Sequence, residues 1–431
     1  MADAPLQVRV ALLGAGTVGS QVARLLYEQR ADLAKRVGAD LVISGIATKE
    51  PDDERLAGLP RDLITDDAAS LIAGADIVVE LIGGIQPARA LVLDALRQGK
   101  AVVTANKALL AAHGPEIYEA ADAAGVDLYF EASVGGAIPI IRPVREGLAG
   151  DRIVRILGIV NGTTNYILDR MTTAGLGYEI ALKEAQDEGY AEADPTADVE
   201  GYDAAAKIAI LASLAFHMRV SLDDVYREGI TEITPFDVAA ATESGHVIKL
   251  LGIAERSDAG VAVRVHPALV PLTHPLATVR GVYNAVFIEA EAAGELMFYG
   301  KGAGGVPTAS AVLGDIVSVA RHLASGGKGP RESNYVSLPI LPMASTRTRF
   351  QIRLEVADRP GVLAKVAAIL GAHDVSIDSV RQPPSGSGEG RAQLVVSTHE
   401  AVESDLRATV EEIRACTTSH AVLSVLRIEG E

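Results

Sequence analysis

Hydrophobic residues in the first part of the chain form short continuous runs separated by amphipathic, helix-like stretches. The runs span residues 8–13, 41–47, 76–82, 101–104 and 126–130. A continuously apolar strand is buried on both faces, and strands that alternate with helices form a parallel sheet covered on both sides. The pattern predicts an α/β fold that begins with a doubly wound parallel sheet, which we assign to residues 1–134.

Longer apolar runs appear after Glu131. They span residues 153–160, 247–254, 261–270 and 285–291. Helices separate some of these runs, including an apolar helix over 203–215, so we expect residues 135–306 to form an α+β domain with a mostly antiparallel sheet. The segment 307–325 has the periodicity of an amphipathic helix, and we expect it to pack back on the first domain.

The last hundred residues divide into two parts. Residues 326–346 are rich in Gly, Pro and Ser and show no periodicity, which predicts a linker. Residues 347–431 then alternate as strand, helix, strand, strand, helix and strand. This β-α-β-β-α-β order is typical of a ferredoxin-like domain.

A glycine-rich loop directly follows the first predicted strand and leads into a helix. It consists of Gly14, Ala15, Gly16, Thr17, Val18 and Gly19. The first glycine permits a tight turn, the second lets the backbone approach a pyrophosphate, and the third lets the helix pack on the sheet. In this context the loop predicts a dinucleotide site.

The end of the second predicted strand bears on the choice of dinucleotide. An acidic residue there would bind a ribose 2′-hydroxyl. Thr48 and Lys49 would suit a 2′-phosphate, whereas Glu50 would oppose it. The sequence leaves NAD and NADP open, and we favour NADP.

Composition and charge exclude several classes of function. The 431 residues carry a net charge of −17, which opposes binding to nucleic acids or anionic membranes. Cys416 is the only cysteine, so an intrachain disulfide and a zinc-thiolate cluster are excluded. The apolar runs are shorter than the roughly 18 residues of a membrane span, and the N-terminus has no basic region. We expect a cytoplasmic protein that acts on small molecules.

The segment 188–207 is rich in ionisable residues. Glu192 and Asp194 precede a helix-breaking proline, and Asp203 and Lys207 lie four residues apart on the apolar helix. One interpretation is a surface ion pair worth about 0.2–0.5 kcal/mol. The other is a buried pair facing a cleft, because the rest of this helix is apolar. A lysine beside a carboxylate in a cleft is a candidate for proton transfer.

The same segment carries a family resemblance. The pattern Ala185-x3-Gly189-Tyr190-Ala191-x2-Asp194-Pro195-x2-Asp198-Val199-x-Gly201-x-Asp203-x3-Lys207 resembles the signature of homoserine dehydrogenases at every fixed position. Similar stretches are 104–107, 129–136, 161–165 and 301–304. The resemblance covers about residues 7–325, and residues 358–363 are similar to the first turn of an ACT domain. It implies a Rossmann-type domain, a substrate-binding and dimerisation domain, and a C-terminal ferredoxin-like ACT domain.

The resemblance implies reversible NAD(P)-dependent interconversion of L-homoserine and L-aspartate 4-semialdehyde, in the biosynthesis of threonine, methionine and isoleucine. It implies that Glu192 binds the substrate ammonium, that Asp203 supports the substrate, and that Lys207 transfers the proton. Lys107 follows a strand of the first sheet and would point into the cleft, so it is a rival for proton transfer and a second ligand for substrate and cofactor. Thr104 and Gly302 are further candidates for cofactor binding.

Two further ligands follow from the resemblance. A sodium-type monovalent cation is implied at Glu131 with the carbonyl groups of Val134, Gly136 and Ile138, since hard cations prefer oxygen ligands. L-threonine is implied as an effector of the ACT domain, in a homodimer or homotetramer. The alternative is an ACT domain that serves only dimerisation. We expect truncation after Ala344 to leave an active core that no longer responds to threonine.

Other classes of function fit the sequence less well. An aldehyde dehydrogenase that forms an acyl-enzyme needs a nucleophilic cysteine, and Cys416 lies at the end of the last predicted helix. A catalytically inactive NAD-binding regulator would not need Glu192, Asp203 and Lys207. Other amino-acid or hydroxy-acid dehydrogenases remain the alternative.

Overall fold

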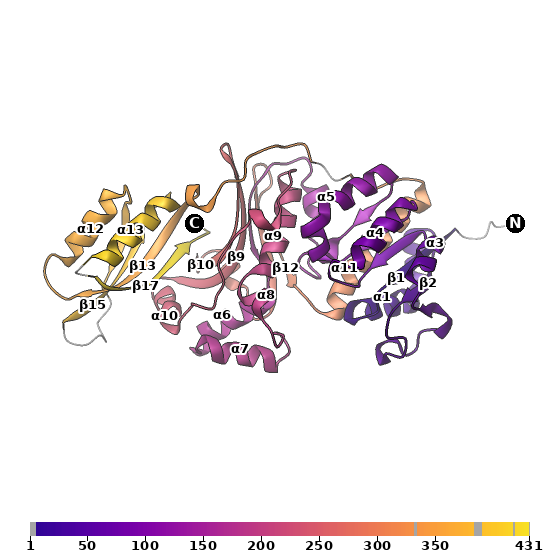
Figure 1. Ribbon diagram of the computed structural model, residues 1–431, viewed down its shortest axis with the longest axis horizontal. Helices are drawn as coiled ribbons and strands as arrows, with labels where there is room; N and C mark the ends of the chain where they lie inside the picture. The colour runs from indigo at the N-terminus through magenta and orange to yellow at the C-terminus, as the bar shows by residue number, and fades with distance from the viewer. Residues whose placement is uncertain (1–5, 332–333, 383–389, 417–418, 431) are drawn as a thin grey trace.

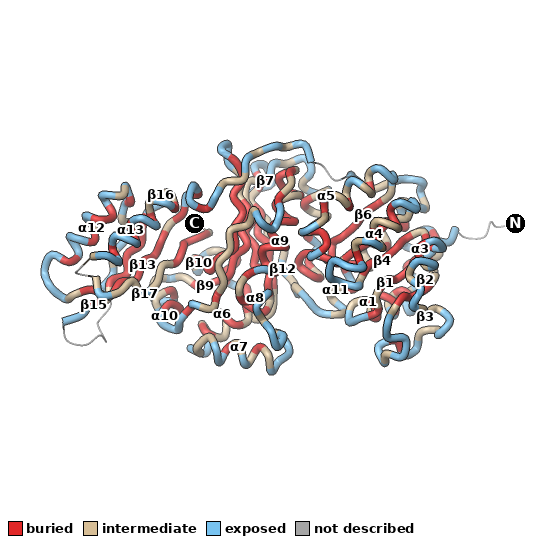
Figure 2. Tube along the Cα trace, in the orientation of Figure 1, coloured by how far each residue is buried: buried red, intermediate tan, exposed pale blue. Residues whose placement is uncertain are grey.

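The computed structural model describes residues 6–331, 334–382, 390–416 and 419–430. The chain forms three units in a row, with the first sheet at the N-terminal end, a second sheet in the middle and a small α/β unit at the C-terminal end (Figure 1). Strands of all three units are buried over much of their length (Figure 2). Among the described residues, no helix combines the length and apolar character that crossing a membrane requires.

The first unit is the predicted doubly wound parallel sheet. Its six strands have the order β3-β2-β1-β4-β5-β6. They are β1 (Gln7–Leu13), β2 (Asp40–Ala47), β3 (Ile64–Thr65), β4 (Ile77–Glu80), β5 (Ala101–Thr104) and β6 (Leu128–Tyr129). All neighbouring strands pair in parallel, and the order in which strands are added reverses between β1 and β4, since β2 and β3 lie on one side of β1 and β4 to β6 on the other. Open sheets of this kind bind ligands at the carboxyl ends of the strands beside such a reversal of strand order.

Helices cover both faces of the first sheet. One face packs against α3 (Ala68–Gly74), α4 (Ala88–Arg97) and α5 (Lys107–Ala124). The other packs against α1 (Thr17–Glu28), α2 (Arg30–Val37) and α11 (Gly305–Ser325). The long helix α11 therefore returns to the first sheet after the chain has built the middle unit (Figure 1).

The middle unit is a mixed sheet with helices. Its strands are β7 (Ile153–Ile159), β8 (Tyr226–Arg227), β9 (His246–Ser257), β10 (Gly260–Pro271), β11 (Tyr283–Ala290) and β12 (Gly294–Lys301). Its helices are α6 (Gly162–Ala174), α7 (Tyr178–Asp187), α8 (Thr196–Val199), α9 (Tyr202–Ala215) and α10 (Pro235–Glu243). The sequence pattern missed β12, because this strand lies at the end of the sheet and most of its residues are partly or fully exposed.

The C-terminal unit has the ferredoxin-like order that the sequence predicts. It consists of β13 (Arg347–Ala357), α12 (Val362–Ala372), β14 (Ile377–Arg381), β15 (Arg391–Thr398), β16 (Ala401–Val402), α13 (Glu403–Ala415) and β17 (Ser419–Ile428). Its main strands have the order β17-β13-β15-β14 and pair antiparallel.

The C-terminal unit is joined to the middle unit through the backbone. Strand β17 pairs in parallel with β10, with Arg427 opposite Ala268, so the two units share one 11-stranded sheet. The segment 326–346 also contacts β10, where the Val261 N–H donates to the Pro339 carbonyl (2.9 Å) and the Leu341 N–H donates to the Val261 carbonyl (2.8 Å). This segment is therefore fixed against the middle unit along part of its length.

Buried charges cross the same junction. The carboxylate of Glu429 accepts hydrogen bonds from Arg264 (3.0 Å) and from Arg155 (2.6 Å), and it lies 3.6 Å from His266. Burial alone would raise the pKa of Glu429, but Arg264, His266 and Arg155 outweigh it and hold that pKa below its usual value. Truncation after Ala344 would remove this carboxylate from the fully buried Arg264. Truncation would leave buried Arg264 with only the partly exposed Glu255 as a partner (3.2 Å), so we expect the truncated core to be less stable than the full chain.

Replacing Glu429 tests the junction without truncation. We expect Glu429→Gln to lower the free energy of unfolding by about 3–5 kcal/mol, because buried Arg264 then keeps only the partly exposed Glu255 as a counter-charge. Since the folded-state pKa of Glu429 is lowered, this stabilisation is fully present above the unfolded value of 4.5 and declines progressively as pH falls from there through the folded-state pKa. Urea unfolding at pH 7 and pH 4 should show the larger difference at pH 7.

Glu291 provides the matched control, because it forms an exposed ion pair with Arg152 (3.1 Å). Glu291→Gln should change stability by less than about 1 kcal/mol. Equal effects of Glu291→Gln and Glu429→Gln would contradict the importance of the junction.

Candidate active site

The glycine-rich loop has the geometry that a dinucleotide phosphate needs. Gly14 has φ +104°, and a Cβ atom there would lie 2.6 Å from the Leu81 carbonyl oxygen. A Cβ on Gly19 would lie 2.1 Å from the Gly14 carbonyl oxygen, so α1 packs closely on this turn. Gly16, in contrast, has open space on its Cβ side and caps the N-terminus of α1. A phosphate can therefore approach the first amides of the helix beside Gly16.

The end of β2 carries a mixed set of charges. Thr48 accepts a hydrogen bond from the Glu50 N–H (3.1 Å), and Lys49 is exposed. The Glu50 carboxylate lies 3.5 Å from Arg55, whose side chain is 44% exposed. Sequence reasoning missed Arg55, because it lies in the irregular stretch after β2. Its guanidinium bonds chiefly to Asp53, with Nε–Oδ2 at 2.8 Å, so it is shared between that carboxylate and Glu50.

A cleft lies between the first sheet and the middle unit. One part, of about 290 Å³, is lined by residues that follow β4 and β5, including Gly83, Asn106 and Lys107. A second part, of about 450 Å³, is lined by Asn161, Thr163 and Tyr190 from the middle unit. Both parts share Lys107, Lys207, Gly302 and Ala303. The two parts therefore form one continuous site at the carboxyl ends of the first sheet.

The two lysines meet at one carboxylate. Asp203 and Lys207 lie on α9, which is buried over most of its length. The Nζ of Lys207 donates to Oδ2 of Asp203 (2.7 Å) and to the Val160 carbonyl (2.7 Å). The Nζ of Lys107, at the start of α5, forms an ion pair with Oδ1 of Asp203. The interpretation as a buried pair facing a cleft is therefore the one that the geometry favours.

This cluster alters the acidity of its members. Burial alone would raise the pKa of Asp203, but the ammonium groups of Lys207 and Lys107 outweigh it and hold that pKa far below its usual value. Burial lowers the pKa of Lys207, although Asp203 opposes the shift. Asp203 is thus ionised at neutral pH and acts as an anchor for both cations.

The two lysines differ in their access to a ligand. The Lys207 side chain is 10% exposed, and two of its three N–H groups already have acceptors. The Lys107 side chain is 46% exposed and lines both parts of the cleft. Lys107 is therefore the more accessible donor.

Asn161 also contacts the cluster, a role that sequence reasoning did not assign. It is the N-cap of α6, and its side-chain N–H groups donate to Asp203 (2.9 Å) and Asp198 (2.6 Å). An Asn followed by Gly-Thr-Thr before a helix is an N-cap signal in the sequence. The contact with Asp203, 42 residues away, depends on tertiary structure.

Three predicted site residues have different surroundings. Gly302 lines both parts of the cleft. Thr104 is fully buried and does not line it, because its hydroxyl donates to the Glu80 carboxylate (2.6 Å) and accepts from the Asn106 N–H (3.0 Å). Glu192 is exposed on the turn after α7 and is not among the residues that line the cleft, although nearby Tyr190 is.

The loop after β6 contains the predicted cation ligands. The Glu131 carboxylate accepts hydrogen bonds from the backbone N–H groups of Ile140 (2.5 Å), Ile141 (2.7 Å) and Arg142 (3.0 Å). Both oxygens of the carboxylate therefore already accept backbone hydrogen bonds. Gly136 has φ +57°, and a Cβ there would lie 2.4 Å from the Gly302 carbonyl oxygen. In the described part of the chain, His, Cys, Asp and Glu do not gather in groups of three that could hold a metal ion.

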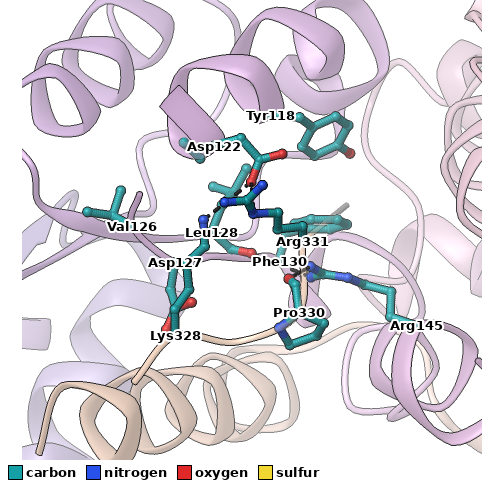
Figure 3. Close-up of a pocket in the computed structure, with 11 residues that line it drawn as sticks. Tyr118, Asp122, Val126, Asp127, Leu128, Phe130, Arg145, Lys328, Pro330 and Arg331 are labelled. Carbon is teal, nitrogen blue, oxygen red and sulfur yellow. Dashed lines mark hydrogen bonds and ion pairs between the residues drawn. The ribbon is translucent and has the colours of Figure 1, made fainter. Parts of the chain in front are cut away.

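A smaller cavity lies at the β6 edge of the first sheet, between α5, β6 and the segment that follows α11 (Figure 3). Its walls include Asp122, whose carboxylate lies 3.3 Å from Lys328 and 3.9 Å from Arg331. Its volume of about 20 Å³ is enough for a water molecule. This cavity is too small for a dinucleotide or an amino acid.

Comparison with known proteins agrees with this geometry. The family model described as homoserine dehydrogenase matches residues 139–317, that of the homoserine dehydrogenase NAD binding domain matches 14–131, and that of the ACT domain matches 350–417. The chain is 55% identical over 433 residues to the homoserine dehydrogenase of Mycobacterium tuberculosis (strain ATCC 25618 / H37Rv), with 98% of each chain covered. It is 53% identical over 431 residues to that of Corynebacterium glutamicum, covering 98% of this chain and 96% of the relative.

Solved structures agree as well. A homoserine dehydrogenase from Thiobacillus denitrificans superposes with a TM-score of 0.92 at 41% identity and 98% coverage of both chains. A hyperthermophilic archaeal homoserine dehydrogenase in complex with NADPH superposes with a TM-score of 0.63 at 27% identity, covering 76% of this chain and 100% of that one. With its family models, its full-length relatives and its fold in agreement, this chain belongs to the homoserine dehydrogenases, which are NAD(P)-dependent oxidoreductases.

Proposed function

We propose that the cleft interconverts L-homoserine and L-aspartate 4-semialdehyde, a step in threonine, methionine and isoleucine biosynthesis, with the roles of individual residues as follows. The observation that carries the proposal is Asp203 held by Lys107 and Lys207 in a cleft of suitable size. The open side of Gly16 fits a bound dinucleotide phosphate. When bound, the nicotinamide accepts the hydride from C4 of homoserine.

The proton on the substrate hydroxyl must move as the hydride leaves. Lys107 has the exposure and position to reach a ligand in both parts of the cleft, which favours it as the proton-transfer group. Lys207 is held by Asp203 and the Val160 carbonyl, so it positions Asp203 and the substrate. Asp203 keeps both cations in place. Glu192 remains the proposed contact for the substrate ammonium, although it lies outside the cleft lining, two residues after Tyr190 of that lining.

Alanine variants separate the two lysines. Lys107→Ala should lower kcat by about 10²–10⁴, the usual contribution of a general acid or base, with the dissociation constant of the dinucleotide within a few-fold. Lys207→Ala should raise the KM for homoserine and lower thermal stability more than Lys107→Ala does. Steady-state kinetics and dinucleotide titration measure both. The control is Lys183→Ala, which removes an exposed lysine on α7. Retention of half of the wild-type kcat in Lys107→Ala would overturn its assignment.

NADP is the proposed preferred dinucleotide. Support comes from exposed Lys49, and Arg55, which is shared between Asp53 and Glu50, adds a second cation near the end of β2. A ribose 2′-phosphate beside these side chains would gain charge-assisted hydrogen bonds that a 2′-hydroxyl would not.

The variant Lys49→Ala tests this preference. We expect the KM for NADPH to rise about tenfold, the effect of losing one charged hydrogen bond, while the KM for NADH changes less than twofold. The exposed Lys35 on α2 supplies the control variant Lys35→Ala. An equal change for NADPH and NADH would place Lys49 outside the 2′-phosphate site.

A sodium-type cation is proposed at the loop after β6. The Glu131 carboxylate is occupied by N–H donors, so the backbone carbonyl oxygens of Glu131, Val134, Gly136 and Ile138 are the suitable ligands. Because this loop touches Gly302, the cation would hold one wall of the cleft in place.

Regulation by L-threonine is proposed for the ACT domain, within a homodimer or homotetramer. A line of contacts runs from this domain to α9. Arg427 donates to Glu403 of α13 (2.6 Å) and to Glu228 (2.9 Å). Arg227, which precedes Glu228 in the chain, donates to the backbone carbonyl of Glu200 (2.7 Å). Glu200 lies three residues before Asp203 in the sequence. A change in the ACT domain can therefore reach the N-terminus of α9 through Glu228.

We expect millimolar threonine to lower activity at least fivefold, since coupling between such sites is about 1–3 kcal/mol. Glu228→Gln should weaken this inhibition while calorimetry still detects threonine binding. The control is Glu232→Gln, in the same segment but outside the line of contacts. A wild-type chain that binds no threonine at millimolar concentration would leave the ACT domain with a structural role only.

A further inference from the structure

Lys249 is a buried lysine that the proposed mechanism does not use. It lies on β9 with 0% of its surface exposed. Its Nζ donates to Oδ1 of Asn165 (2.9 Å) and to the Val279 carbonyl (2.5 Å), and no carboxylate of the described residues lies within ion-pair distance. Burial lowers its pKa to about 8. Burial of an ammonium group is unfavourable, and an apolar side chain of similar size would avoid that cost. The hydrogen bonds of the Lys249 ammonium therefore bear on its role.

Those contacts lead to one face of α6. Asn161, Asn165 and Asp169 are spaced four residues apart, so they lie on the same side of the helix. Asn165 donates from its side chain to the Gly281 carbonyl (2.8 Å) and the Tyr283 carbonyl (3.2 Å). Asp169 accepts from the Gly281 N–H (2.9 Å). This face of α6 thus holds the turn 279–283 near its middle and Asp203 at its N-terminal end.

The turn 279–283 forms part of the wall of the cleft. Val282 lines the larger part of the cleft, and a Cβ on Gly162 would lie 2.8 Å from the Val282 carbonyl oxygen. The turn leads into β11, where Tyr283 lies opposite Lys301, another residue of the wall. The next residue, Asn284, is 1% exposed and packs closely on Gly302. A Cβ atom on Gly302 would lie 1.9 Å from the side-chain nitrogen of Asn284. A displaced turn would therefore alter the cleft on two sides.

We propose that Lys249 is a positioning residue for the amino-acid substrate, because its ammonium and Asn165 together fix the turn 279–283 against the N-terminus of α6. The inference rests on the proposed use of this cleft for homoserine. The dinucleotide loop lies on the other unit, so Lys249 acts on substrate binding and leaves dinucleotide binding unchanged.

Two variants test this role. Lys249→Met removes the ammonium and keeps the length of the side chain. Asn165→Asp keeps an acceptor for Lys249 and adds a counter-charge, but it removes both donors to the turn. Each should raise the KM for homoserine at least fivefold, with kcat and the dissociation constant of NADPH within twofold of wild type. The control is Lys183→Met on the surface of α7, which should change none of these values.

The outcomes separate the possibilities. An unchanged KM in either folded variant overturns the proposal, as does a fall in kcat with an unchanged KM. If Lys249→Met does not fold, Asn165→Asp decides the matter alone, since its ion pair with Lys249 remains buried and neutralised. Absence of homoserine oxidation by the wild-type chain would instead overturn the proposed function of the cleft.

Discussion

The carboxylate of Asp203 joins the two units that form the cleft. It comes from the middle unit, yet one of its partners is Lys107 at the edge of the first sheet. Lys207, on the same helix, neutralises Asp203 from within the middle unit. Lys107 adds a second cation from the first unit, and the two ammonium groups together hold the pKa of Asp203 far below its usual value. The same contact places an accessible ammonium beside the space for a substrate. In this chain the ion pair between Asp203 and Lys107 links the two units and is also part of the candidate active site.

Buried polar side chains near the ends of helices and strands connect several of the other elements to one another. Asn161 caps α6 and contacts Asp203, while the same helix holds the turn 279–283 through Asn165. At the other end of the middle unit, Glu429 neutralises Arg264 where β17 meets β10. These buried contacts are directional, so they fix how neighbouring elements are oriented as well as how tightly they pack.

Several site residues were accessible to sequence reasoning because their signals are local. The spacing of Asp203 and Lys207 places them on one face of a helix, and the loop from Gly14 to Gly19 follows a strand directly. Other properties were not accessible. The commitment of the Glu131 carboxylate to backbone amides, the burial of Thr104 and the position of Glu192 outside the cleft lining all depend on segments distant in sequence or on the path of a loop.

The sequence by itself determined the doubly wound first sheet and the ferredoxin-like C-terminal unit, because hydrophobic periodicity and glycine turns are properties of neighbouring residues. In the middle unit it missed the exposed strand β12. Tertiary structure alone decided that the middle and C-terminal units share a sheet, that Lys107 and Lys207 meet at one carboxylate, and that Lys249 is buried with no carboxylate of the described residues within ion-pair distance. Those features depend on distances between segments that lie far apart in the chain, and no local pattern encodes such distances.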